Sequence, residues 1–144
     1  MRDVVLQNQA ATLWWRSEGF WHFRMEAFYE ISAAEVEEFF DALEARSSGR
    51  RSPLLLDRSN PYSPQFGAWQ MLVERAPQAV SAIAYYAPTP AATMAAEFTA
   101  EVILKGWGAV RVFQREAAAV AWLLEWVERD GAGDETSPPD TGGA

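Results

Sequence analysis

The sequence predicts an α/β fold: a single domain with the order β-β-α-β-α-β-α-β-α, in which helices cover a mixed, mostly parallel five-stranded sheet. Short apolar runs of strand length alternate with longer segments of helical periodicity, which is typical of strand-helix-strand units. Parallel neighbours need crossover helices, whereas the two aromatic runs near the start are close enough for a hairpin. The 144 residues suit one domain, and 49% of them are hydrophobic, enough for a packed core.

The first three elements are a hairpin and a helix. Residues 12–16 (TLWWR) and 20–25 (FWHFRM) are aromatic-rich runs joined by the short connector SEG, which predicts two antiparallel strands. In the helix that follows, Ser32 and Glu35 have the spacing of a capping box, and Gly49 stands where the helix should end. Its apolar stripe is formed by Val36, Phe39, Phe40 and Leu43.

Three strand-helix units complete the domain. The run PLLLD (53–57) has the length and continuous apolarity of a strand buried on both faces. Ser63 and Pro64 then predict the cap and the first residue of a helix that ends at Pro77 and turns Phe66, Trp69 and Val73 inward. The remaining elements are a strand over 79–86, a helix from Thr89 and Pro90 to about Lys105 that Gly106 ends, a strand over 109–114 and a last helix whose stripe is Val120, Leu123, Leu124 and Val127.

The chain is predicted to divide into three parts. Residues 1–10 form a lead, residues 11–129 form the folded domain, and residues 130–144 form a disordered acidic tail. The tail is predicted because it consists of Gly, Pro, Ser, Thr, Ala and acidic residues without apolar periodicity.

Composition excludes several classes of protein. The absence of cysteine excludes disulfide scaffolds, thiol nucleophiles and cysteine-ligated metals. The net charge of -8 argues against a nucleic-acid partner, since an acidic chain repels the phosphate backbone. We interpret the basic cluster GRRS (49–52), with Arg46 and Arg58 nearby, as a solvated turn. No signal-peptide pattern and no apolar window of membrane length occur, which predicts a cytoplasmic protein without an integral membrane segment.

Enzyme chemistry has little support in the sequence. The single histidine, His22, alternates with Phe20 and Arg24 on one face of a strand, which favours a structural role over a general base or a metal ligand. The acidic residues of the first helix are typical of a solvated helix face rather than a metal cluster. No phosphate-binding loop or catalytic signature is present. We therefore expect no enzyme activity, no cofactor and no metal.

The loop after PLLLD is the strongest candidate for a functional surface. Asp57 ends a buried strand at its carboxyl edge, where open α/β sheets bind ligands, although an Asx-type turn is the simpler interpretation. Ser63, at the start of the next helix, is interpreted first as a helix cap and second as a position that would favour a nearby phosphate. The candidate partner or ligand surface consists of Asp57, Arg58, Ser59, Asn60 and Ser63.

Tryptophan is a second source of candidates, because 7 Trp are more than one small core easily holds. Consecutive residues on a strand point to opposite faces, so one of Trp14 and Trp15 should face outward. Trp122 and Trp126 lie beside the apolar stripe of the last helix. An exposed surface formed by these four residues would be a dimer interface or a groove for an apolar ligand.

The element order, together with PLLLDRSN, AVSAIAYYAPTPAATMAAEF and VRVFQREAAAVAWL, resembles the STAS/SpoIIAA-like group of bacterial domains. The ending, a strand in Val-Phe and then an Ala-x-x-Trp-Leu helix, is most similar to its uncharacterised STAS/CRAL-TRIO-like branch. The resemblance implies a fold shared by lipid-binding domains and by anti-sigma-factor antagonists, which are phosphorylated at the loop that contains Ser59 and Ser63 here. The antagonists carry Asp-Ser-Ser/Thr-Gly at that position, whereas this chain has Asp57-Arg58-Ser59-Asn60-Pro61.

Together these observations favour a non-enzymatic, regulatory module of a bacterial cell that binds an unidentified protein partner and forms a homodimer. The alternative is a domain that binds an apolar small molecule or a lipid in a pocket between sheet and helices.

Overall fold

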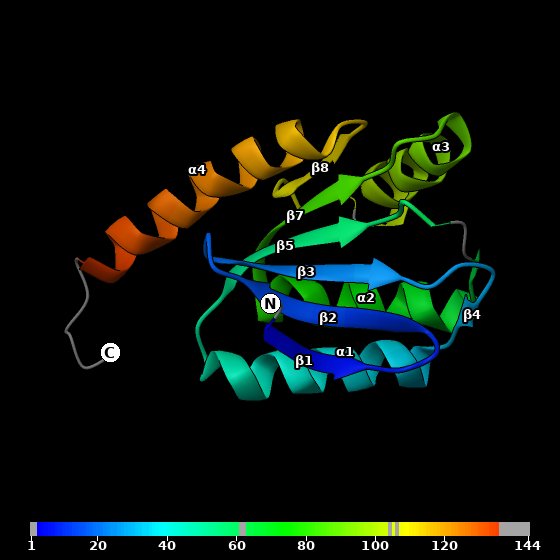
Figure 1. The fold of residues 1–144 in the computed structure, drawn as a ribbon, viewed down its shortest axis with the longest axis horizontal. Coiled ribbons are helices and arrows are strands. Elements are labelled where there is room, and N and C mark those ends of the chain that lie inside the picture. The colour runs from blue at the N-terminus through cyan, green and yellow to red at the C-terminus, as the bar shows by residue number, and fades with distance from the viewer. Residues whose placement is uncertain (1–2, 61–62, 104, 106, 136–144) are drawn as a thin grey trace.

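The core of the molecule is a six-stranded sheet with the strand order β1-β2-β3-β5-β7-β8 (Figure 1). The computed structural model describes residues 3–60, 63–103, 105 and 107–135. The strands of the sheet are β1 (Asp3–Gln7), β2 (Ala11–Arg16), β3 (Phe20–Met25), β5 (Ser52–Asp57), β7 (Val80–Tyr86) and β8 (Val110–Phe113). The pairs β1–β2 and β2–β3 are antiparallel, and β3, β5, β7 and β8 run parallel to one another. The predicted α/β class with a mixed, mostly parallel sheet is thus confirmed.

Four α-helices accompany the sheet in the described part of the chain. They are α1 (Ala33–Ser47), α2 (Phe66–Ala79), α3 (Pro90–Phe98) and α4 (Glu116–Glu135), and a π-helical turn, η1 (Thr99–Ile103), follows α3. Two of the predicted helix starts are confirmed. Ser32 and Glu35 form the capping box of α1, and the Thr89 hydroxyl accepts the Ala92 N–H at 3.1 Å ahead of Pro90.

The predicted count of five strands is wrong, because β1 adds a sixth strand within the predicted lead of residues 1–10. This strand pairs with β2, and a bulge interrupts the register between Val4 and Leu6. Val5 and Leu6 are half-buried against the main core. Such a bulge breaks the alternation by which a half-buried strand is predicted, so the local sequence carries no clear strand signal.

The start of α2 also differs from the prediction. Ser63 does not stand at the N-cap position of this helix, because Ser63–Pro64 forms a two-residue strand, β6, which pairs in parallel with β4 (Glu30–Ile31). The Gln65 N–H donates to the Ile31 carbonyl at 2.9 Å, and the helix begins only after this bond. Gln65 is the N-cap residue and makes no side-chain capping bond.

The inward face of α2 is formed by other residues than predicted. Phe66 and Val73 are exposed, and the buried residues are Ala68, Leu72, Ala76 and Ala79. Small alanines allow the helix to approach its neighbours closely, which a face of large aromatic residues would prevent. Pro77 lies inside the helix rather than at its end, and the Val80 N–H still donates to the Ala76 carbonyl.

The later helix ends differ as well. The α-helix that begins at Pro90 changes to the π-helical turn at Thr99 before the predicted end, and Gly106 lies outside the described residues. Helix α4 continues to Glu135, five residues beyond the predicted start of the tail at 130. Each glycine within a helix costs only about 1 kcal/mol, so Gly131 and Gly133 weaken this helix without ending it. Residues 136–144 lie outside the described part.

The two faces of the sheet carry two hydrophobic cores of unequal size. The larger core lies against α1 and α2 and contains Leu54, Leu56, Phe23 and Tyr85 from the sheet. The smaller core lies under α4 and consists of Phe20, Leu55, Ala84, Ala119 and Leu123. In Figure 1, α4 crosses the β7 and β5 side of the sheet, and its C-terminal half runs past the ends of the strands.

Candidate functional site

A buried polar cluster lies between β2, β3 and β5, on the same face of the sheet as α4. His22 Nε2 lies 2.7 Å from Asp57 Oδ2, and both residues are only 4% exposed. The Trp14 ring stacks on the imidazole at 3.9 Å, and Arg16 Nη1 lies 3.2 Å from His22 Nδ1. Arginine can only donate, so Nδ1 accepts, and the proton of the neutral ring is on Nε2, where it bonds to Asp57.

Asp57 is the centre of this cluster. Its Oδ1 accepts the Ser59 N–H at 2.9 Å, which confirms the predicted Asx-type turn. Burial alone would raise the pKa of Asp57, but hydrogen bonds from His22 and Ser59 outweigh it and hold the pKa below its usual value. In a nucleophilic triad the imidazole stands between the hydroxyl and the carboxylate, whereas here the carboxylate stands between His22 and Ser59. The cluster is therefore built to hold the loop rather than to activate a serine.

The other residues of the loop connect the carboxyl ends of three strands. The Arg58 N–H donates to the Tyr86 carbonyl at 2.8 Å, and Asn60 Nδ2 donates to the Met25 carbonyl at 3.1 Å. Arg58 is buried, Asn60 is half-buried and Ser59 is exposed. Ser63 lies across from Glu30 in the short pairing of β6 with β4. Among the four residues from 57 to 60, Ser59 is thus the one that a partner can reach.

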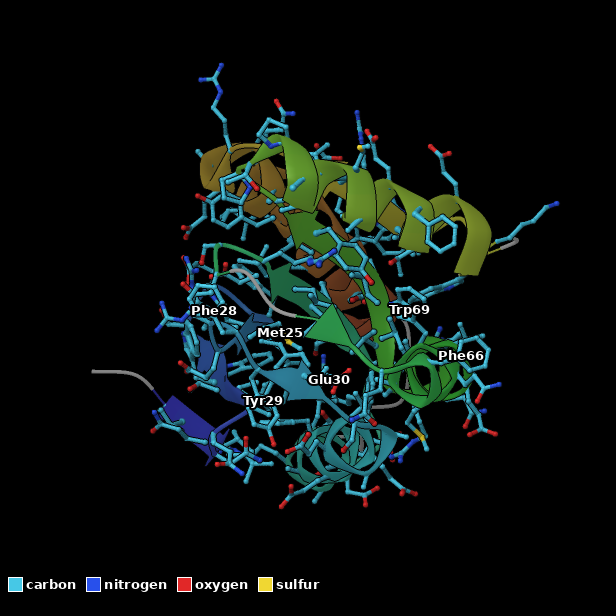
Figure 2. All side chains as sticks on the ribbon, turned by 90° about the vertical axis from the view of Figure 1, so that its right-hand side faces the viewer. Met25, Phe28, Tyr29, Glu30, Phe66 and Trp69 are labelled. Atoms are coloured by element: carbon cyan, nitrogen blue, oxygen red, sulfur yellow. The ribbon has the colours of Figure 1, made fainter. Side chains whose placement is uncertain are left out.

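Exposed aromatic residues lie at the same carboxyl end of the sheet. Phe28 is 89% exposed and has a φ of 58°, and Phe66 is 68% exposed at the start of α2. Trp69 is half-buried, one helical turn further along α2. Figure 2 views this end of the molecule and shows Phe28 on one side and Phe66 with Trp69 on the other. We call these three residues the aromatic edge.

The sequence predicted Phe66 and Trp69 as core residues and gave no indication of Phe28. A left-handed backbone conformation is rare for a bulky side chain and cannot be inferred from the identity of the residue. A prediction based on apolar periodicity assigns any aromatic residue at helical spacing to the core. The buried face of α2 is formed by Ala68, Leu72, Ala76 and Ala79, which leaves Phe66 on the outward side.

The four tryptophans proposed as an exposed surface have different environments. Trp14 is only 5% exposed, because it stacks on His22 and Arg24 lies over its ring, so the prediction that it could lie on an open surface is wrong. Trp15 is half-buried with its edge on Trp21. Trp122 and Trp126 are half-buried on α4 with their ring centres 6.0 Å apart. The proposed surface is therefore not continuous.

The space between the sheet, α1 and α2 is small. A cavity of about 40 Å³ lies there, lined among others by Phe23, Met25, Leu72 and Thr99. Ligand pockets for drug-sized molecules measure roughly 300 to 1,000 Å³. In the described residues no group of three or more acidic or histidine side chains is placed to hold a metal ion. None of the helices in that part of the chain is both long and apolar enough to cross a membrane.

No family model matches the sequence, and no curated protein does. Among solved structures, the chain is similar to an uncharacterised protein from Shewanella loihica PV-4, of the DUF3478 family and with a SpoIIAA-like fold. The two share 14% identity with a TM-score of 0.55, over 85% of this chain and 95% of the other. The chain is thus a domain with a SpoIIAA-like fold. At this level of identity the likeness concerns the fold and assigns no function.

Proposed function

We propose that this domain is a non-enzymatic interaction module that binds a protein partner through the aromatic edge and the adjacent Ser59 loop. The observation that supports the proposal most is the conformation of Phe28. A left-handed conformation costs an L-residue about 1–2 kcal/mol, and an exposed ring recovers none of this by burial. A costly conformation that presents a phenyl ring to solvent is better explained by contact with another molecule than by the stability of this chain.

The chemistry of the surface suits a protein partner. Exposed aromatic residues surrounded by polar groups are typical of interface hot spots. Here Glu30, two residues after Phe28 in the chain, and Ser59, in the loop after β5, are exposed polar residues at the same end of the strands. The surface lies on the loops and on the start of α2 at the carboxyl end of the parallel strands, where open α/β sheets bind ligands. The resemblance to STAS-like domains, some of which act by binding proteins, agrees with this assignment.

The alternative, an apolar ligand bound between the sheet and the helices, has less support. The cavity of about 40 Å³ in this place holds little more than one water molecule. A lipid would need α2 to move away from the sheet and expose the alanine face that packs there. A partner can reach the aromatic edge without any movement of α2.

The proposal can be tested with Phe28→Gly. Glycine adopts a positive φ without cost, so this variant removes the ring while the fold keeps its stability. Affinity-tagged protein would be crosslinked in the cells that produce it, and crosslinked partners would be identified by mass spectrometry. We expect one partner crosslinked to the edge of the wild type and at least a tenfold loss with Phe28→Gly, as for a hot-spot residue.

Met94→Ser is the matched control, because Met94 is also exposed and apolar but lies outside the aromatic edge, on α3. This control should keep the partner. Equal recovery by wild type and Phe28→Gly would overturn the proposal. Sedimentation of both proteins identifies the case in which the partner is a second copy, since Phe28→Gly would then convert a dimer to a monomer.

A second variant tests whether phosphorylation of Ser59 would regulate binding of the partner. Ser59→Asp places a negative charge next to the aromatic edge and should abolish capture of the partner, while an exposed loop position leaves stability within about 0.5 kcal/mol. Capture of the partner at the wild-type level would exclude a phosphorylation switch at Ser59 and leave the binding function intact.

A further inference from the structure

A second hollow, larger than the cavity of about 40 Å³ between the sheet, α1 and α2, lies at the opposite end of the sheet from the aromatic edge. Its volume is about 490 Å³, within the range of ligand pockets. The end of α1, the start of β5, the β2–β3 turn and the C-terminal half of α4 line it, and the residues important here are Trp15, Trp21, Arg46, Arg50, Val127 and Asp130. The sequence predicts a solvated turn for the GRRS cluster beside it, but the fold brings this cluster together with two tryptophans and with α4.

The rim of the hollow is rich in guanidinium groups. Arg46 and Arg50 line it, and Arg46 forms an ion pair with Asp3, the first acidic residue of the lining. The second is Asp130. Burial raises the pKa of Asp130, although the Ser81 hydroxyl donates to it at 2.8 Å and the charges of Arg51, Arg129 and Arg50 oppose the rise. The lining itself thus holds two arginines and two carboxylates, and two further arginines, Arg51 and Arg129, lie close enough to act on Asp130.

Two indole rings line the hollow. Trp15 and Trp21 contact each other edge to face, with ring centres 4.8 Å apart. Trp21 is 2% exposed, and its Nε1–H has no acceptor among the described residues. A buried indole N–H usually has a partner, and leaving it without one costs free energy. The donor is explained if a bound molecule brings an acceptor to this indole.

We propose that this hollow binds a small planar aromatic carboxylate, with one carboxylate oxygen at Arg50, the other at the Trp21 Nε1–H, and the ring against the two indoles. Arginine presents five donors in a fork that matches a carboxylate, so Arg50 can keep other contacts while it binds one. An inorganic anion would leave the indole rings unused, and an uncharged ring would leave the guanidinium groups unused. The proposed site does not depend on the proposed function, because it lies at the other end of the strands.

Calorimetric titration with cinnamate and with its neutral isostere cinnamamide tests the proposal. The full chain should bind cinnamate at least tenfold more tightly than cinnamamide, because the carboxylate forms a charge-assisted hydrogen bond with Arg50 that the neutral amide cannot form. Arg50→Gln should weaken cinnamate binding by about tenfold or more and leave cinnamamide unchanged. Trp21→Phe, which keeps a ring but removes the N–H, should weaken cinnamate binding by roughly threefold to tenfold.

Arg111→Gln is the control, since Arg111 is an exposed arginine on the distant edge strand β8. This variant should bind cinnamate within about twofold of the wild type. It removes one distant surface charge, which salt screens, and no contact with the ligand. The proposal is overturned if cinnamate does not bind, if cinnamamide binds equally well, or if Arg111→Gln loses as much affinity as Arg50→Gln. Arg50 lies on the surface after α1, so the Arg50→Gln result does not depend on tolerance of a change in the core.

Discussion

At the scale of single residues, Asp57 determines how the fold responds to acid. A carboxylate whose pKa is lower in the folded than in the unfolded chain stabilises the fold at neutral pH. That stabilisation is present above the unfolded pKa of about 3.9 and is lost as the pH falls through the folded value. The hydrogen bonds from His22 and Ser59 should therefore make the protein less stable below about pH 4.

Asp57→Asn tests this expectation. At neutral pH we expect the variant to lose about 1–3 kcal/mol of unfolding free energy, because an amide cannot accept both buried hydrogen bonds as well as a carboxylate can. Urea unfolding from pH 2 to 7 should also show a flatter acid limb than the wild type. Asp41→Asn, at an exposed ion pair with Arg75, should cost less than about 1 kcal/mol. An unchanged acid limb in Asp57→Asn would show that other carboxylates control acid unfolding.

Phe28 makes the opposite kind of contribution, since its conformation costs stability. Phe28→Gly should raise the unfolding free energy by about 0.5–1 kcal/mol, the relief of a left-handed L-residue less the added backbone entropy of glycine. Thermal unfolding of the isolated protein measures the change without any partner. A loss of more than about 1 kcal/mol would mean that the ring packs against the chain, which would also weaken the proposed function.

At the scale of elements, local patterns predicted the strands and helices whose signals are complete within one segment. The capping box at Ser32, the cap and proline at Thr89 and the apolar run of β5 were predicted because these signals need no distant partner. Strand β1 and the pairing of β4 with β6 were not predicted. A bulged strand and a two-residue strand are defined by their pairing with distant segments and carry no complete local signal. The inward face of α2 was missed for a similar reason, since alanine carries a weak apolar signal.

The candidate site could be predicted only in part. The Asp57 turn follows from the sequence, but its bond to His22 depends on the parallel register of β3 with β5, which places Arg24 beside Asp57 and His22 beside Leu55. The aromatic edge depends on a backbone conformation at Phe28 that no residue pattern indicates. The second hollow joins residues from α1, β5 and α4 that are far apart in the sequence, so only the assembled fold brings them together.

The docking of α4 on the β2–β3 turn depends on one glycine. Gly19 has a φ of 112°, and a Cβ placed there would lie 2.9 Å from Val127 Cγ1. Gly19→Ala should therefore lower the unfolding free energy by about 1–3 kcal/mol, from backbone strain and from the clash with α4.

A double-mutant cycle separates the two causes. In a Val127→Ala background, Gly19→Ala should cost at least about 0.5 kcal/mol less, because the clash is gone while the strain remains. Gly49→Ala is the control for strain alone, since φ is 84° there and no atom lies within 4 Å of the added Cβ. If the costs of Gly19→Ala and Val127→Ala simply add, α4 does not rest on this turn.

At the scale of the whole molecule, one sheet joins two cores that share no side chains. Leu54 and Leu55 are neighbours on the central strand β5, and each is almost completely buried, Leu54 in the larger core and Leu55 in the smaller core under α4. Because both cores depend on the same strand, we expect the domain to unfold as one cooperative unit although α4 covers its face alone.

Leu54→Ala and Leu55→Ala test this cooperativity. Each should lower the unfolding free energy by about 2–5 kcal/mol, the usual cost of a cavity at a buried leucine. In both variants the loss of helix by circular dichroism and of packing by tryptophan fluorescence should still coincide at one denaturant concentration, since a weakened core on either face destabilises the strand that both share. Leu124→Ala, at an exposed position of α4, should cost less than about 1 kcal/mol. If Leu55→Ala instead separates the two transitions, α4 unfolds from the sheet as an independent layer, and the wall that it gives to the second hollow would be lost before the rest of the fold.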